Sequence, residues 1–229
     1  MRRDDAEYPS ALKCLGNAAP STIEFLGPQS VPDLRILGLI CSVSCPGSVI
    51  IKIYEVVRAL RDAGVVVCGG FHSPMEQECL DFLIRGRQTV VLRAATGLRH
   101  LALSEQAQSA RRDGRLVVMS PFGDEVETAT PWHGSYRNGV VAALSDALFV
   151  PHADPKGKVL VNAKQAIDCG QTVLTFDDRA NQQLIDLGAH PTNVEGLLAS
   201  VSRLVFGTST GRQPFTFRPS VSGKAEVQD

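Results

Sequence analysis

The sequence predicts an α/β fold, in which a doubly wound, mostly parallel sheet carries helices on both faces. Short runs of β-branched and apolar residues recur at wide spacing along the chain of 229 residues, and these runs are almost continuously apolar. Strands of a parallel sheet have this character because helices cover both of their faces. The segments between the runs carry helix signals, so strand and helix alternate, and right-handed crossovers are expected between the strands.

The expected strands are the apolar runs themselves, at residues 35–43, 65–68, 89–93, 116–120, 147–151 and 172–176. The first expected helix, residues 46–62, has an amphipathic stripe made of Val49, Ile53, Val56, Val57 and Leu60. The second, residues 74–85, begins with Ser73 as N-cap, Pro74 in the first helical position and Glu76 three residues after the cap. Further helices are expected at residues 104–112, 136–145, 159–168, 180–187 and 194–205.

These elements are expected to form one domain. Residues 31–206 would make up a Rossmann-like domain, residues 1–30 an irregular lead-in, and residues 207–229 a flexible C-terminal tail. A chain of this size buries about 70% of its unfolded surface, so it needs no disulfide or metal for stability. The six cysteines are expected to be reduced and mostly buried, since the close pair Cys41 and Cys45 has no second pair to complete a zinc site.

Composition and charge exclude several classes of protein. With 44% hydrophobic and 21% charged residues, the chain is neither disordered nor collagen-like. No apolar run approaches the roughly 18 residues of a membrane span, and residues 1–7 mix arginines with acids, so a cytoplasmic protein without a membrane segment is expected. Because the net charge is −1, any contact with nucleic acid has to come from a local cationic patch.

Ligands of such sheets bind beyond the carboxyl ends of the strands, so the loops after the strands are the candidate binding segments. Ser42 lies in a small-residue loop that leads into a helix N-terminus, where backbone N–H groups can bind an anion. Gly69 and Gly70 follow the next strand and would let a ligand approach the backbone closely. Neither loop has the GxGxxG or Walker A pattern, which argues against NAD and P-loop nucleotide sites. The alternative is tight turns without a ligand.

Polar side chains suited to phosphate stand at the starts of later helices: Arg137, Asn138, Lys156, Lys158 and Asn181. Each has a simpler interpretation on its own, as a solvated turn or a helix cap. In the predicted topology, however, all of these loops fall on one rim of the sheet. This convergence favours an anion-binding rim over a set of unrelated turns.

The sequence assigns no catalytic residue, cofactor or metal ligand. The five histidines are not spaced as zinc ligands, and no serine stands in a G-x-S-x-G pattern. No acid–base pair is identifiable by spacing, so a hydrolase has little support. Trp132, which precedes the expected helix that carries Arg137, could stack on a base or cover an edge of the core.

The order of these loops resembles the DNA-processing protein A family (DprA, also called Smf) over roughly residues 8–205. The resemblance rests on Tyr8-Pro9 with Leu26-Gly27, on residues 38–42, on Gly69-Gly70, on Arg137-Asn138 with residues 140–145, and on residues 181–189. The sequence departs from the family where Cys41-Ser42-Val43 replaces Gly-Ser-Arg, where residues 72–76 replace Gly-Ile-Asp, and where Gly139 replaces the last residue of Arg-Asn-Arg.

The resemblance implies a non-enzymatic protein that binds single-stranded DNA and forms a homodimer. It also implies assistance to a RecA-type recombinase in DNA uptake (natural transformation) or recombination. We expect no room for the N-terminal helical domain and C-terminal winged helix that family members commonly carry. The candidate DNA-backbone site consists of Ser42, Gly69, Gly70, Arg137, Asn138, Lys156, Lys158 and Asn181.

Two other functions stay open at this point. The first alternative is a small-nucleotide-binding sensor or a phosphoribohydrolase-like enzyme of the same superfamily, although the Pro-Gly-Gly-x-Gly-Thr motif of those enzymes is missing from the sequence. The second is a structural partner protein whose rim binds nothing.

Overall fold

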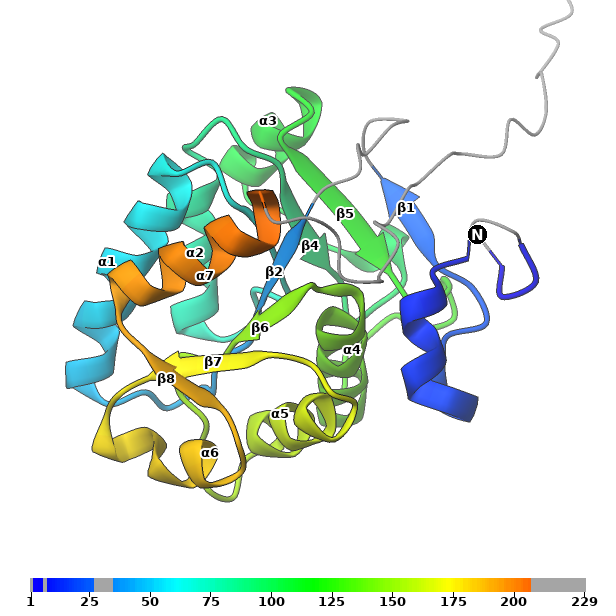
Figure 1. The fold of residues 1–229 in the computed structure, drawn as a ribbon. Coiled ribbons are helices and arrows are strands. Elements are labelled where there is room, and N and C mark those ends of the chain that lie inside the picture. The colour runs from blue at the N-terminus through cyan, green and yellow to red at the C-terminus, as the bar shows by residue number, and fades with distance from the viewer. Residues whose placement is uncertain (1, 6–7, 27–34, 207–229) are drawn as a thin grey trace, which may run out of the picture.

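The computed structural model describes residues 2–5, 8–26 and 35–206, the side chains of residues 203–206 excepted. One sheet runs through these residues, with the strands β1 (Glu24–Leu26), β2 (Ile36–Leu39), β3 (Val66–Gly69), β4 (Val90–Arg93), β5 (Leu116–Ser120), β6 (Ala147–Phe149), β7 (Val173–Phe176) and β8 (His190–Thr192). Their spatial order is β1-β5-β4-β3-β2-β6-β7-β8 (Figure 1). Strand β1 pairs antiparallel with β5 at one edge, and the other pairs are parallel. The predicted α/β fold with a mostly parallel sheet is confirmed.

The α-helices are α1 (Gly47–Asp62), α2 (Pro74–Leu83), α3 (Glu105–Arg112), α4 (Pro131–Leu144), α5 (Lys158–Asp168), α6 (Gln182–Asp186) and α7 (Val194–Phe206). Three short segments are 3₁₀ helices: η1 (Ser10–Ala18), η2 (Leu98–His100) and η3 (Arg179–Asn181). Helices α1, α2, α3, α5 and α7 lie within two residues of the predicted bounds at each end. The predicted helix at residues 180–187 is divided between η3 and α6. Among the described helices, none combines the length and apolarity needed to cross a bilayer.

Alternating residues of the strands divide the core between the two faces of the sheet. Leu37 and Leu39 pack in a cluster with side chains of α1, α2, α3 and α7, whereas Ile36 and Ile40 pack with η1, α4, α5 and α6. Figure 1 shows α4 and α5 together on one side of the sheet and α1 on the other. Helices on both faces, as predicted, leave only the rims of the sheet open to a ligand.

The N-terminal caps of α2 and α4 determine the residues at which these two helices begin. In α2 the predicted capping box is present, because the Ser73 side chain accepts from the backbone of Glu76 and the Glu76 side chain accepts from the backbone of Ser73. In α4 the same arrangement joins Thr130 and His133, with Pro131 in the first helical position. The predicted start of this helix at residue 136 is therefore wrong, and α4 begins at Pro131.

The expectation of an irregular lead-in is wrong in part, because Ser10–Ala18 form η1 and Glu24–Leu26 form β1. Leu12 and Ile23 are fully buried in the cluster that contains α4, and the Tyr136 hydroxyl of α4 donates to the carbonyl of Ala18 (2.8 Å). These contacts attach the segment to the same face of the sheet as α4. The tail predicted at residues 207–229 lies outside the described residues.

Candidate functional site

A pocket of about 700 Å³ lies beyond the carboxyl ends of β2, β3 and β6. Strand order reverses here, since the chain continues from β2 to β3 on one side and later returns to β6 on the other. Such switch points are where open α/β sheets bind ligands. Ser73, Thr130 and Gly157, the N-cap residues of α2, α4 and α5, all line this pocket. Three helix N-termini thus converge on one cavity and favour an anion within it.

Ser42 holds together the loops on either side of the switch point. Its N–H donates to the carbonyl of His152 (3.1 Å), and its Oγ accepts from the N–H of Asp154 (2.8 Å). Both partners belong to the loop after β6. The predicted strands at residues 35–43 and 147–151 are shorter than expected, ending at Leu39 and Phe149, and the freed residues build these two loops.

Glu76 is a buried carboxylate in the pocket lining, 3% exposed, that accepts backbone hydrogen bonds from two loops. Its Oε1 accepts from the N–H of Cys41 (2.8 Å), and its Oε2 accepts from those of His72 (2.9 Å) and Ser73 (3.3 Å). The sequence identified Glu76 only as part of a helix cap. Its carboxylate also fixes the loop after β2 to the loop after β3. This role could not be predicted from the sequence, because Cys41 lies far from Glu76 along the chain.

Arg137 lies in the second turn of α4 and lines the pocket, with only 3% of the residue exposed. Its Nη1 donates to the carbonyl of Arg93 (3.0 Å), and in the described part of the chain its buried Nε has no hydrogen-bond partner. Burial lowers the pKa of the Arg137 guanidinium, and the nearby Glu76 carboxylate opposes that shift. A buried cation with an unused donor is suited to an anionic ligand.

Gly70 makes room for this guanidinium. A Cβ at Gly70 would lie 1.5 Å from Nη1 of Arg137, so any side chain here would displace the arginine. Gly69 ends β3, and a Cβ there would lie 3.0 Å from the carbonyl of Leu39. Neither glycine is part of the pocket lining. The close approach that the sequence predicted for a ligand is made, at Gly70, by the protein's own arginine.

Asn138, Lys156 and Lys158 line the same pocket. Asn138 is 8% exposed, and its buried Oδ1 has no hydrogen-bond partner among the described residues. The two lysines are exposed at the start of α5. The lining thus contains three cationic side chains, those of Arg137 and the two lysines, and two carboxylates, those of Glu76 and Asp154. This excess makes the pocket a local cationic patch on a chain of nearly neutral charge.

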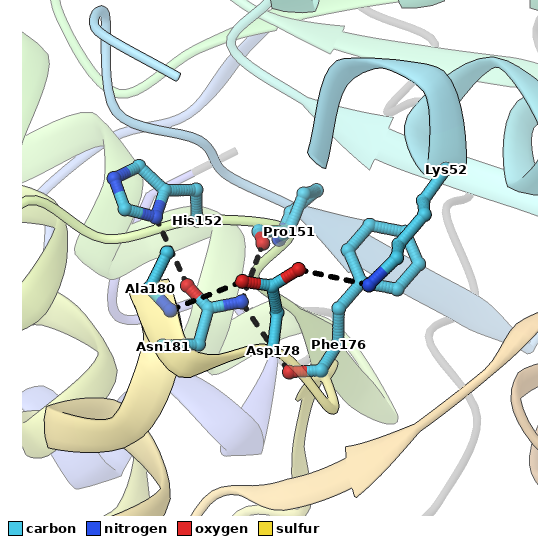
Figure 2. A network of polar contacts seen from close by, with 7 residues as sticks. All are labelled: Lys52, Pro151, His152, Phe176, Asp178, Ala180 and Asn181. Carbon is cyan, nitrogen blue, oxygen red and sulfur yellow. Dashed lines mark hydrogen bonds and ion pairs between the residues drawn. The ribbon is translucent and has the colours of Figure 1, made fainter. Parts of the chain in front are cut away.

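Asn181 belongs to a neighbouring network and not to the pocket lining (Figure 2). Its Nδ2 donates to the carbonyls of Pro151 (2.8 Å) and Phe176 (3.4 Å), and its Oδ1 is 3.0 Å from Nδ1 of His152. These contacts join the ends of β6 and β7 beneath the loop that carries Asp154. The structure therefore brings Ser42, Arg137, Asn138, Lys156 and Lys158 together around one cavity, whereas Gly69, Gly70 and Asn181 are not part of its lining.

An ion pair completes this network. Lys52 of α1 donates to Oδ2 of Asp178 (2.8 Å), while Oδ1 accepts from the N–H of Ala180 (3.1 Å). Figure 2 shows how Asp178 lies between Lys52 and the turn that presents Asn181. The hydrogen bond from Lys52 is the main cause that lowers the pKa of Asp178, and the Ala180 N–H adds to it.

Sequence reasoning missed a second buried arginine. Arg93, at the end of β4, is fully buried, and its Nε donates to Sγ of Cys68 (3.2 Å). Both of its Nη atoms lack hydrogen-bond partners in the region that the structure covers. The signal that could have identified Arg93 is a charged residue at the end of an apolar strand run. Such residues are rarely buried without a specific partner, so this position could have been singled out from the sequence.

Trp132 lies in the first turn of α4 beside Pro131, which lines the pocket. It is 60% exposed and stacks on Tyr136, with ring centroids 5.1 Å apart and an interplanar angle of 13°. Tyr136 and His133 also contact Phe122, so the indole rests on an aromatic cluster. Both roles stay open for Trp132, because the indole covers Phe122 and Tyr136 at the edge of the core and also remains exposed beside the pocket.

Comparison with known proteins decides the family. The model of the DNA recombination-mediator protein A family matches residues 1–201. The chain belongs to this family. Comparison with curated proteins gave no significant match.

Solved structures agree with membership of the DNA recombination-mediator protein A family. DNA processing protein A (DprA) from Streptococcus pneumoniae is 17% identical, with a TM-score of 0.72 over 87% of this chain and 72% of that one. DNA processing protein A from Helicobacter pylori, described with a single-stranded DNA binding mode, is 16% identical, with a TM-score of 0.71 over 86% and 93%. The molybdenum cofactor carrier protein of Chlamydomonas reinhardtii has a TM-score of 0.53 at 15% identity, over 76% and 99%. At these identities the likeness establishes the fold that is shared.

Proposed function

We propose that this protein binds single-stranded DNA through its sugar–phosphate backbone in the pocket at the switch point. The observation that carries the proposal is the buried Arg137, whose Nε has no partner within the described structure, in a cavity where the N-termini of α2, α4 and α5 converge. Phosphate is the anion that such a combination of guanidinium and helix termini recognises. Membership of the DNA recombination-mediator protein A family supports DNA as the source of that phosphate.

In this proposal the residues have different roles. Arg137, Lys156 and Lys158 contact phosphates, and Asn138 supplies an amide to the ligand. Ser42 shapes the wall, Gly70 admits the arginine, and Gly69 keeps β2 and β3 close. Asn181 acts indirectly, by fixing the loop after β6. No base-reading group is required, so binding is tolerant of sequence.

The direct test is binding of a fluorescent oligodeoxythymidylate, followed by polarisation, with unlabelled competitors. We expect the unlabelled oligonucleotide to displace the probe at far lower concentration than thymidine monophosphate does. The cavity volume of about 700 Å³ is also suitable for a single small ligand, which is the specific reason to include the nucleotide. Tighter binding of nucleoside monophosphates than of the oligonucleotide would instead favour the small-nucleotide sensor or phosphoribohydrolase-like enzyme.

We also propose a homodimer that assists a RecA-type recombinase in DNA uptake or recombination, on the basis of family membership. Sedimentation velocity at micromolar concentration should give the mass of two chains of 24.6 kDa each. A single species with the mass of one chain at that concentration would contradict the dimer. Stimulation of strand exchange by a purified recombinase on protein-coated DNA tests the second part of the proposal.

Binding to single-stranded DNA should weaken as salt is added. If Arg137, Lys156 and Lys158 each neutralise a phosphate, the slope of log affinity against log salt is about −2, because each contact on a single strand contributes about −0.7. Affinity for oligodeoxythymidylate should therefore fall about 20-fold between roughly 50 and 200 mM salt. A double replacement of Lys156 and Lys158 by glutamine should bring the slope to about −0.7. An affinity that does not change over this range would contradict the electrostatic account.

Trp132 should report on bound DNA. It is the only tryptophan of the chain, it is exposed, and it stands beside the pocket, so a base that leaves the pocket can stack on it. We expect its fluorescence to decrease during titration with oligodeoxythymidylate. Inorganic phosphate, which has no base, should leave the emission unchanged. If emission stays constant while polarisation shows saturation by DNA, Trp132 does not contact the bases.

A further inference from the structure

Arginines gather at the edge of the sheet opposite the pocket, where β3, β4 and β5 begin. These parallel strands are neighbours and follow α1, α2 and α3 along the chain, so the three connecting turns lie side by side. Residues 61–65, 81–89 and 111–115, which form these turns and the helix ends before them, contain three carboxylates, those of Asp62, Asp81 and Asp113. The same residues contain six arginines, which we call the arginine surface: Arg61, Arg85, Arg87, Arg111, Arg112 and Arg115.

The three turns meet at Gly86. A Cβ at Gly86 would lie 2.7 Å from Cγ of Arg61, so the Arg61 side chain of α1 lies against the turn after α2. From the turn after α3, Nη1 of Arg115 donates to the carbonyl of Gly86 (3.5 Å). Arg85 and Arg87 flank Gly86 along the chain. Arginines of all three turns therefore lie around one glycine.

Most of this positive charge has no partner within the described structure. Two of the six arginines pair with carboxylates, Arg61 with Asp62 and Arg115 with Asp113, both at 2.8 Å. The other four form no ion pair with a described residue, and three of those four are exposed. A helix C-terminus favours cations, which accounts for the arginines in the last turns of α1 and α3. It does not account for Arg87, which lies beyond the end of α2.

We propose that the arginine surface binds an acidic segment of a partner protein. A guanidinium is planar and matches a carboxylate with two parallel hydrogen bonds, and arginine is enriched at protein interfaces. The surface also has an apolar centre, because Phe82 of α2 is half-buried and its ring contacts Tyr54 of α1. The guanidiniums of Arg58 and Arg85 lie 5.7 and 5.2 Å from the centroid of this ring. Cations around an aromatic ring fit a segment in which carboxylates accompany apolar side chains.

Nucleic acid fits this surface less well. Helices α1, α2 and α3 run from the carboxyl edge of the sheet to the arginine surface, and each carries an exposed carboxylate on the way: Glu55, Glu78 and Glu105. A DNA strand that continued from the pocket would pass these carboxylates, which repel its phosphates. The Phe82 ring already contacts two guanidiniums and Tyr54, so it is not free to stack on a base. A short peptide needs to reach only the arginines.

The test uses the full chain and a fluorescein-labelled octapeptide in which six aspartates surround two central leucines. Binding is followed by polarisation at low ionic strength, where exposed charges are screened least. We expect a dissociation constant below about 1 mM, and weaker binding as salt is added. The same peptide with asparagine in place of aspartate should not bind. No binding of the acidic peptide at about 1 mM would overturn the proposal.

A pair of matched double variants locates the peptide. Arg87→Gln with Arg112→Gln removes two exposed guanidiniums of the arginine surface, and it should lower the affinity for the peptide about 2- to 30-fold, since an exposed ion pair contributes little. Arg99→Gln with Arg179→Gln makes the same change in net charge at two exposed arginines elsewhere and should bind the peptide as the wild type does. Both variants should melt within a few degrees of the wild type. Unchanged affinity in the first variant, or an equal loss in both, would overturn the proposal.

Binding of DNA distinguishes this proposal from the proposed function, because the arginine surface and the pocket lining share no residue. Arg87→Gln with Arg112→Gln should bind oligodeoxythymidylate with wild-type affinity, and saturating oligodeoxythymidylate should not displace the peptide. Loss of DNA affinity in this variant, or displacement of the peptide by DNA, would make the surface part of a nucleic-acid site and overturn the proposal. If the wild type binds no DNA, the proposed function fails, and the peptide titration still decides the role of the arginine surface.

Discussion

Arg137→Met should lower the affinity for oligodeoxythymidylate by roughly 10- to 150-fold, which corresponds to about 1.5–3 kcal/mol for a charge-assisted hydrogen bond. Arg137 is the buried cation of the pocket, and its Nε is unused by the described residues. Methionine keeps an unbranched apolar chain beneath Gly70 and removes the guanidinium alone. Binding is measured by fluorescence polarisation at one fixed salt concentration.

The same variant distinguishes a ligand contact from a structural one. Within the described residues Arg137 donates to a carbonyl and forms no ion pair, so removing its charge should change the melting temperature by only a few degrees. Arg87→Met, at an exposed position near the opposite end of the strands, is the matched control and should bind DNA normally. A much lower melting temperature, with unchanged binding by the molecules that remain folded, would make Arg137 a structural residue and remove it from the site.

The structure changes the physical reason for this prediction. From the sequence, the helix was expected to start at residue 136, which would put Arg137 in its first turn, where the helix dipole disfavours a cation. Thr130 followed by Pro131 is a sequence signal for an earlier helix start, and in the structure Thr130 caps α4 together with His133. In the structure Arg137 stands in the second turn, and its burial and its unused Nε indicate an anionic partner.

The parts of the fold that could be predicted are those governed by local patterns. Continuous apolar runs identified β2 to β7, and Ser73, Pro74 and Glu76 gave the start of α2 to the residue. Strands β1 and β8 are only three residues long, β1 is half-buried and β8 is largely exposed, so neither leaves an apolar run to detect. Their pairing depends on the neighbouring strand, which is a tertiary contact.

The site could be predicted only as a set of loops. Parallel topology sufficed to bring Ser42, Arg137 and the lysines to one rim. The topology could not indicate which polar groups form hydrogen bonds within the protein. This difference distinguishes Asn181, whose amide is fully hydrogen-bonded, from Asn138, whose Oδ1 has no partner among the described residues. The topology also could not show that the space at Gly70 is filled by Arg137, since that contact joins residues far apart in the chain.

Glu76→Ala should destabilise the fold more than any other replacement of a carboxylate in the pocket lining. Three backbone N–H groups donate to Glu76, and those of Cys41 and Ser73 belong to buried residues. A buried donor left without a partner costs about 1–3 kcal/mol, so the two together predict a loss of about 2–6 kcal/mol. For a chain of this size, thermal unfolding should shift down by at least about 4 °C.

Comparison with Glu78→Ala separates this anchoring role from a general effect on α2. Glu78 lies two residues along the same helix and is exposed, so its replacement should leave the melting temperature nearly unchanged. Glu76→Gln keeps one oxygen acceptor but turns an amide group toward the other donors, so it should melt between the wild type and Glu76→Ala. If Glu76→Ala has the same melting temperature as the wild type, the loops after β2 and β3 hold their positions without the carboxylate. The wall of the pocket would then depend on Ser42 and its contacts with the loop after β6.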